Sequence, residues 1–291
     1  MSNTYPIVAV TGSSGAGTTT VRHAFADIFR REGIKAAFVE GDSFRRYDRK
    51  DMKQAVQVSI QHGRPISHFG PEANLFDRLE SLFRTYSENG AGEMRHYVQG
   101  DEVDLYGQEP GTFTPWRAVP RDADLLFYEG LHGAVALEGE GIDVSRWVDL
   151  LIGVVPIVNL EWIQKIHRDA KEKGKSPESV TASILRRLED YVKHIAPQFS
   201  RTHINFQRVP TVDTSDPFIA RDIPTLDESV VVVRFRDPRH HNFPDYLRRI
   251  HDSYMSRPNT MVVPGGKMGV ALEVVCTPII HRMLEAKRAS Y

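Results

Sequence analysis

A glycine-rich run close to the N-terminus contains the first residues whose types and spacing could do chemistry. Its glycines at 12 and 17 have the spacing of a P-loop, between a strand-like and a helix-like segment. Small residues there let backbone N–H groups turn onto phosphate oxygens at a helix N-terminus. We expect the nucleotide phosphates at Gly12, Ser13, Ser14, Gly15, Ala16, Gly17, Thr18, Thr19 and Thr20, with the Thr19 hydroxyl on Mg²⁺. A plain glycine turn is the alternative.

The P-loop lacks its usual lysine, because Thr18 stands at that position. The missing charge must come from elsewhere, or the loop binds nucleotide without catalysing. Lys165, Arg168 and Asp169 share one face of an expected helix, at positions i, i+3 and i+4. Two cations and an acid could clamp a transferring phosphoryl group and assist its metal, with Lys165 as the replacement cation. A solvated helix face would show the same pattern.

Two acids follow expected strands, where ligands bind in open α/β sheets. Asp42 could accept a hydroxyl proton as phosphate transfers, which is the general-base role in kinases. Its alternative is a helix N-cap. Glu129 could hold Mg²⁺ directly or through water, or could form an ion pair at the strand end. His132 is expected to be structural.

Basic residues follow Asp42 closely. Arginines and lysines there suit an anionic substrate, because phosphates are normally held by such side chains. A plain charged helix is the alternative. The residues are Arg45, Arg46, Arg49, Lys50 and Lys53.

The elements that must position these residues alternate between strands and helices. The first unit is a strand over residues 6–11, a helix over 20–32 and a strand over 36–40. Apolar or β-branched runs predict strands at 124–129, 148–155, 229–235 and 260–263. Charged segments predict helices at 162–173 and 176–194, and a last helix covers 267–287, interrupted at Pro278.

This order predicts one α/β domain over residues 1–291, with a mostly parallel, mixed sheet and helices on both faces. An insertion of helices and loops lies at about 50–120. It contains one amphipathic helix with apolar residues at 75, 79, 82, 83 and 86 and loops over 90–120.

Composition narrows the class of protein. Lys plus Arg number 37 against 38 Asp plus Glu, so no overall basic footprint for nucleic acid exists. No window approaches the roughly 18 apolar residues of a membrane span. Cys276 is the only cysteine, which excludes an intramolecular disulfide, and we expect it to be buried. A cytoplasmic enzyme is the expectation.

Several long segments of the sequence resemble bacterial phosphoribulokinases, within the phosphoribulokinase and uridine kinase type of P-loop kinases. The resemblance runs from residue 10 to about residue 267. It implies transfer of a phosphoryl group from MgATP to the C1 hydroxyl of D-ribulose 5-phosphate, giving ribulose 1,5-bisphosphate, with carbon fixation in the Calvin cycle as the usual setting. The segments are VTGSSGAGTTT, VEGDSF, LLFYEGLHGAV, VNLEWIQKIHRD, INFQRVPTVDTS, DESVVVVRF and MVVPGGK.

The resemblance also implies roles for single residues. Asp42 is implied as the base, Asp169 as a second essential acid and Glu129 as the metal-associated acid, so these three acids and Thr19 are the expected metal set. Lys165 and Arg168 are implied as phosphate-stabilising cations. Thr18 fits the family pattern. Contacts to the sugar phosphate are implied for Arg49, Lys53 and Tyr97. Activation by NADH across a homo-oligomer is implied for Arg31, Arg234 and Arg257.

Three departures concern the expected sugar-phosphate site. The family usually has histidine where this chain has Arg45 and Gln99, and commonly arginine where it has Lys173. The acceptor is therefore ribulose 5-phosphate or a different small phosphorylated sugar. A nucleotide-binding regulatory protein without catalysis is the third possibility. It predicts loss of Asp42, Glu129 or Asp169, and all three are present.

Overall fold

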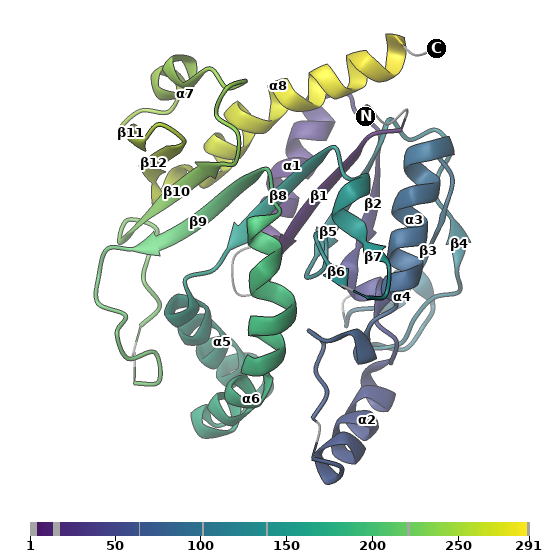
Figure 1. The fold of residues 1–291 in the computed structure, drawn as a ribbon. Coiled ribbons are helices and arrows are strands. Elements are labelled where there is room, and N and C mark those ends of the chain that lie inside the picture. The colour runs from purple at the N-terminus through teal and green to yellow at the C-terminus, as the bar shows by residue number, and fades with distance from the viewer. Residues whose placement is uncertain are drawn as a thin grey trace.

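An eight-stranded mixed sheet runs through the whole structure. The structure is a computed structural model, and it describes residues 5–13, 18–63, 65–100, 102–137, 139–219 and 222–289. The strand order is β11-β12-β10-β9-β8-β1-β5-β2 (Figure 1). Its central strands are β1 (Ile7–Gly12), β5 (Leu125–Gly130) and β8 (Leu150–Val155). They are near-continuous apolar runs because helices cover both of their faces.

Strand direction divides the sheet into two parts. β2 (Ala36–Glu40), β5, β1, β8 and β9 (Ile204–Pro210) are parallel. β10 (Ser229–Phe235), β12 (Thr260–Pro264) and β11 (Tyr254–Arg257) continue the sheet as antiparallel strands. All carboxyl ends of the parallel strands therefore lie at one end of the sheet.

Helices pack on the two faces of the sheet and bury two separate cores. α1 (Thr18–Glu32) and α8 (Met268–Ala289) cover one face, where Val8, Val10 and Phe127 are buried. α3 (Phe76–Asn89) covers the other face, against the alternate residues Ile7 and Ala9. This two-faced arrangement confirms the predicted fold class.

Three helices extend beyond the carboxyl ends of the parallel strands, in the lower part of Figure 1. They are α2 (Arg49–Gln61), α5 (Val158–Lys173) and α6 (Pro177–Asp190). The predicted insertion at about 50–120 contains α2 and α3. In its 90–120 part, predicted as loops, the described residues form only the short α4 (Val103–Tyr106), β3 (Glu93–Met94) and β4 (Arg117–Ala118).

The remaining elements are short. A π-helical segment, η4 (Tyr191–Ile195), continues α6, and α7 (Phe243–Arg249) links β10 to β11. The others are β6 (Ala136–Leu137), β7 (Ile142–Asp143), η1 (Gly41–Phe44), η2 (Pro71–Ala73), η3 (Val144–Trp147), η5 (Ala196–Ser200) and η6 (Gly265–Lys267).

Several details differ from the sequence analysis. The predicted break at Pro278 is wrong, because α8 continues through it while Val275, Ile280 and Leu284 bury their side chains against the sheet. The strands β9 and β11 were not predicted. Cys276 is fully buried as expected, and burial raises the pKa of its thiol. In the described part of the chain, no helix is long and apolar enough to cross a membrane.

Candidate active site

A pocket of about 460 Å³ opens at the carboxyl ends of β1, β2 and β5. The chain enters it where each strand ends, at Ser13, at Asp42 and at Glu129. Lys165 of α5 and Arg187 of α6 line it as well. The pocket therefore gathers acids, cations and the start of the predicted phosphate loop from segments far apart in the sequence.

The predicted phosphate loop is described only at its borders. Ser14, Gly15, Ala16 and Gly17 lie outside the described residues, as do the side chains of Thr18 and Thr19. Gly12 ends β1, and α1 begins at Thr18. A strand therefore precedes this segment and a helix follows it, as on the two sides of a P-loop.

Two glycines let the chain that follows β2 lie directly against the last residue of its neighbour β5. A Cβ atom on Gly130 would lie 2.7 Å from the Cα atom of Gly41. A Cβ atom on Gly41 would lie 2.5 Å from the buried hydroxyl of Tyr128. Real Cβ atoms do not approach so closely, so both positions require glycine. The contact puts Asp42 and Glu129 into one pocket.

Asp42 forms an ion pair inside this pocket. Its Oδ1 atom lies 2.7 Å from Nη2 of Arg45. Asp42 is not a helix cap, because the N-cap position of η1 is Glu40. The alternative of a capping role is therefore removed, and the carboxylate faces a cation and the pocket.

Asp169 is buried on α5 and holds the predicted cations together. Its Oδ2 atom accepts from Nζ of Lys165 and its Oδ1 atom from Nζ of Lys173, both at 2.9 Å. Nε of Arg168 lies 3.6 Å from Oδ1. Burial alone would raise the pKa of Asp169, but these hydrogen bonds outweigh it and hold the pKa below its usual value.

Lys165, Arg168 and Asp169 lie together on one face of α5 as predicted, but they differ in their contacts. Lys165 lines the pocket, and burial lowers the pKa of its ammonium group despite the bond to Asp169. Lys173, a predicted sugar-phosphate contact, lies on the far side of the same carboxylate. Both Asp169 oxygens are engaged by lysines, so in this arrangement Asp169 organises the cations.

The predicted sugar-phosphate residues fall into two groups. Arg45 and Gln99 line the pocket, and the Arg45 guanidinium lies 5.2 Å from the ring centroid of the buried Tyr97. Arg49 and Lys53 lie on α2 and do not line it. The Arg49 side chain packs against Gly111, whose carbonyl oxygen accepts from the Arg49 backbone N–H at 2.8 Å.

Sequence analysis missed several further residues of the pocket. Arg187, His68 and Glu161 line it. Burial, then the charges of Arg45 and Arg187, lower the pKa of His68 to about 3, so the ring is neutral. Burial raises the pKa of Glu161. Glu161 lies one helical turn before Lys165, which is a spacing that the sequence analysis could have used.

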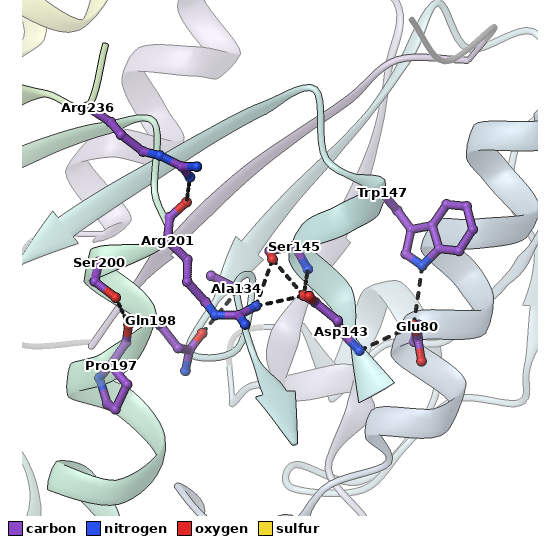
Figure 2. Close-up of polar contacts among 10 residues, drawn as sticks. All are labelled: Glu80, Ala134, Asp143, Ser145, Trp147, Pro197, Gln198, Ser200, Arg201 and Arg236. Carbon is purple, nitrogen blue, oxygen red and sulfur yellow. Dashed lines mark hydrogen bonds and ion pairs between the residues drawn. The ribbon is translucent and has the colours of Figure 1, made fainter. Parts of the chain in front are cut away.

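A buried glutamine fixes the segment that follows β5. The Oε1 atom of Gln198 accepts from the Ala134 N–H at 3.0 Å (Figure 2). It also accepts from the Thr11 hydroxyl at 3.3 Å. Its Nε2 atom donates to the carbonyl oxygen of Leu131 at 3.0 Å. These bonds join the end of β1 to the chain beyond Glu129.

His132 lies in this segment and is buried, as expected of a structural residue. Its Nε2 atom donates to the carbonyl oxygen of His68 at 3.1 Å, and its ring packs edge-on against Phe76 with 4.7 Å between centroids. Burial lowers the pKa of His132 to about 4.

The oxygen donors of the pocket fit a Mg²⁺ ion that binds together with a nucleotide. Asp42 and Glu129 both line the pocket. Mg²⁺ is usually held by one or two carboxylates plus substrate phosphates and waters, not by a complete protein cage. Accordingly, the described residues contain no group of three or more metal-binding side chains.

A second, smaller pocket of about 130 Å³ lies beside the start of α1. Its walls are mostly apolar or glycine. They are Thr20, Val155, Pro156, Ile157, Leu160, Glu161, Gln164, Arg208, Leu226, Gly265, Gly266, Met268 and Gly269. Glu161 lines both pockets, so the two adjoin at this carboxylate.

The three predicted effector arginines lie in two different parts of the fold. Arg234 and Arg257 lie on β10 and β11, and both pair in register with Thr260 of the strand between them. Arg31 lies on α1, where it forms an ion pair of 2.8 Å with Glu273 of α8.

Comparisons with known proteins agree with this geometry. The family model described as "Phosphoribulokinase / Uridine kinase family" matches residues 7–215. The chromosomal phosphoribulokinase of Cupriavidus necator is 57% identical over 290 residues, which cover 99% of both chains. A probable phosphoribulokinase of Escherichia coli K12 is 54% identical, again over 99% of both.

The same likeness holds in three dimensions. A solved phosphoribulokinase from Rhodobacter spheroides superimposes with a TM-score of 0.90 at 52% identity, covering 99% of this chain and 100% of that chain. The fold and the site define a P-loop kinase, an enzyme that transfers a phosphoryl group. The chain belongs to the phosphoribulokinase/uridine kinase family, which confirms the resemblance found in the sequence.

The buried neutral His132 predicts a loss of stability in acid. Its pKa is about 4 in the folded chain and about 6.5 when unfolded, so only the unfolded chain takes up this proton between those values. Stability must fall as the pH falls through that window. The unfolding free energy, measured by urea titration, falls between pH 7 and pH 4.5. In His132→Gln this fall should be about 2–3 kcal/mol smaller than in wild type.

Exposed His23 supplies the control for replacing a histidine by glutamine, through the variant His23→Gln. Comparing each variant with itself at two pH values removes any constant cost of the substitution. An identical acid-induced loss in wild type and His132→Gln would contradict the assignment of a neutral, buried ring.

Proposed function

We propose that the protein transfers the γ-phosphoryl group of MgATP to the C1 hydroxyl of D-ribulose 5-phosphate, giving ribulose 1,5-bisphosphate, with Asp42 as the general base. The observation that carries the proposal is the pocket that combines Asp42, Glu129 and Lys165 with the end of β1. The names of the relatives, each above 50% identical over nearly the whole chain, support the choice of acceptor.

Each group of the pocket has a task in this reaction. The acceptor oxygen forms a bond to the γ-phosphorus, the bond between that phosphorus and the ADP oxygen breaks, and Asp42 takes the hydroxyl proton. Lys165 faces the charge that develops on the phosphoryl oxygens. Bound Mg²⁺ neutralises phosphate charge, and Glu129, Asp42 and Thr19 are its proposed ligands.

The nucleotide would occupy both of the adjoining pockets. Its phosphates would lie against residues 12–20, where backbone N–H groups and the start of α1 favour anions. The smaller pocket beside α1 is lined by apolar side chains and glycines and suits the base of ATP. Asp169 then acts on the transferring group through Lys165 and Arg168, the cations it holds.

Cationic side chains in the pocket favour a phosphorylated sugar as the acceptor. Arg45, Arg187 and Lys165 line the pocket. A different phosphorylated sugar is the second candidate, because Arg45 and Gln99 replace the family's usual histidines. The arginine reaches farther and is permanently charged, and it must leave Asp42 before that carboxylate can accept a proton.

Regulation is part of the proposal. Arg31, Arg234 and Arg257 match arginines that in related bacterial enzymes are linked to activation by NADH. The separation of Arg31 from the other two suits an effect that acts across a homo-oligomer. A cytoplasmic location and a role in carbon fixation go with these substrates.

An assay of ADP release over several sugar phosphates tests the function. We expect ribulose 5-phosphate to be turned over at least about tenfold more efficiently, in kcat/KM, than ribose 5-phosphate, xylulose 5-phosphate or fructose 6-phosphate. A tenfold preference for another of these would replace the acceptor while keeping the kinase. Absence of sugar-dependent ADP release would contradict the kinase proposal altogether.

The role of Asp42 has its own test. Asp42→Asn should lower kcat about a hundred- to ten-thousand-fold while MgATP affinity changes far less, because the proton acceptor is lost but Glu129, Thr19 and the phosphate contacts remain to hold MgATP. Steady-state kinetics and calorimetric titration of MgATP measure the two effects. Asp51→Asn, an exposed acid on α2, is the matched control. Retention of more than about a tenth of the wild-type kcat would exclude Asp42 as the base.

A further inference from the structure

A separate pocket, of about 630 Å³, lies at the opposite end of the sheet from the candidate active site. It is formed by the starts of β8 and β9, the end of β10, the turn that follows and one face of α8. β8 and β9 run away from it toward the active site. A strand of six residues such as β8 spans about 20 Å, so the two pockets are well separated. Nothing in the proposed kinase reaction uses this separate pocket.

Cationic side chains form its rim. Arg236 and Arg239 follow β10 and Arg282 projects from α8, and all three are exposed. Within the described part of the chain, Arg282 has no hydrogen bond or ion pair to another residue. Arg236 donates from Nη1 to the carbonyl oxygen of Arg201 at 3.0 Å (Figure 2). That contact fixes the guanidinium and leaves its other N–H groups available.

The two carboxylates of the pocket are already engaged. Asp149 accepts from the Ile7 N–H at 2.9 Å, at the start of β1. Asp237 holds Arg239 through two contacts, with Nε at 2.9 Å from Oδ1 and Nη2 at 2.6 Å from Oδ2. Asp237 therefore orients one arginine, while no carboxylate among the described residues pairs with Arg236 or Arg282. An anion is the complementary ligand.

The floor of the pocket is apolar, which distinguishes it from a simple charged surface. Leu150 and Ile204 are buried there and Ile279 closes the side of α8. His203 accepts from the Leu151 N–H at Nδ1, at 3.0 Å, which leaves Nε2 as the donor of the neutral ring. Apolar walls with a few convergent polar groups are typical of sites for small organic molecules.

We propose that this pocket binds a small organic phosphate, with the phosphate on Arg236, Arg239 and Arg282 and the carbon skeleton on Leu150, Ile204 and Ile279. The planar guanidinium groups suit the oxygens of a phosphate dianion. The apolar floor excludes inorganic phosphate as the best ligand. This site is separate from the kinase reaction, so it stands or falls independently of the proposed acceptor.

Calorimetric titration with phenyl phosphate, at constant ionic strength, tests the proposal in the intact protein. The double variant Arg239→Gln with Arg282→Gln should bind phenyl phosphate at least about tenfold more weakly than wild type. Arg288→Gln is the matched control, because Arg288 is exposed on the same helix but does not line the pocket, and it should retain wild-type affinity. Binding of the probe in the catalytic pocket, at the other end of the sheet, adds the same contribution to every isotherm, so the variants are compared through the contribution that the substitutions remove.

Three results would overturn the proposal. Wild-type affinity in the double variant would mean that the rim arginines hold no ligand. Equal weakening in Arg288→Gln would reduce the effect to general surface charge. Inorganic phosphate binding as tightly as phenyl phosphate would show an anion-attracting patch without a site for the carbon skeleton. All substituted residues are exposed, so thermal melts should match wild type.

Discussion

The contact between Gly41 and Gly130 is the constraint on which the candidate active site depends. β2 and β5 are paired neighbours in the sheet up to Glu40 and Glu129, and Gly41 and Gly130 come directly after that pair. The missing Cβ atoms of these two glycines let the chain beyond β2 lie directly against the last residue of β5. Asp42 and Glu129 consequently line one pocket beside the end of β1. Gln198 then holds the segment beyond β5 in place through Thr11 and Ala134.

Charge is arranged around a phosphate loop that carries no lysine. α5 supplies Lys165, and the buried carboxylate of Asp169 positions it together with Arg168 and Lys173. A carboxylate that is nearly inaccessible to water would be costly without partners, and the two lysines supply them. The cluster thus keeps a cation at the pocket without placing it on the loop itself.

The elements that the sequence predicts best are those with a strong local pattern. The strands at Ala36–Glu40 and Ser229–Phe235 have the predicted bounds, because apolar and β-branched residues mark them. β9 was missed because polar side chains such as Asn205, Gln207 and Arg208 interrupt its apolar positions. The low helix propensity of Pro278 predicts a break in the last helix. The burial of apolar side chains in the turns before and after Pro278 outweighs that low propensity, so α8 continues.

The site follows the same rule. Asp42 and Glu129 could be predicted because strand ends mark them, and Lys165 and Asp169 because helical spacing does. His68 and Arg187 could not, since only tertiary packing carries them into the pocket. The ion pair between Asp42 and Arg45 also lies beyond sequence analysis, although both residues were candidates.

The central claim is that Lys165 replaces the lysine that the loop lacks. Lys165→Met tests it most directly, because Lys173 and Arg168 remain to pair with Asp169. The account predicts a fall in kcat of about a hundred- to a thousandfold with little change in MgATP affinity, measured by kinetics and calorimetry. Lys171→Met, on the exposed side of the same helix, should behave as wild type. An unchanged kcat, or equal losses in kcat and in MgATP affinity, would contradict it.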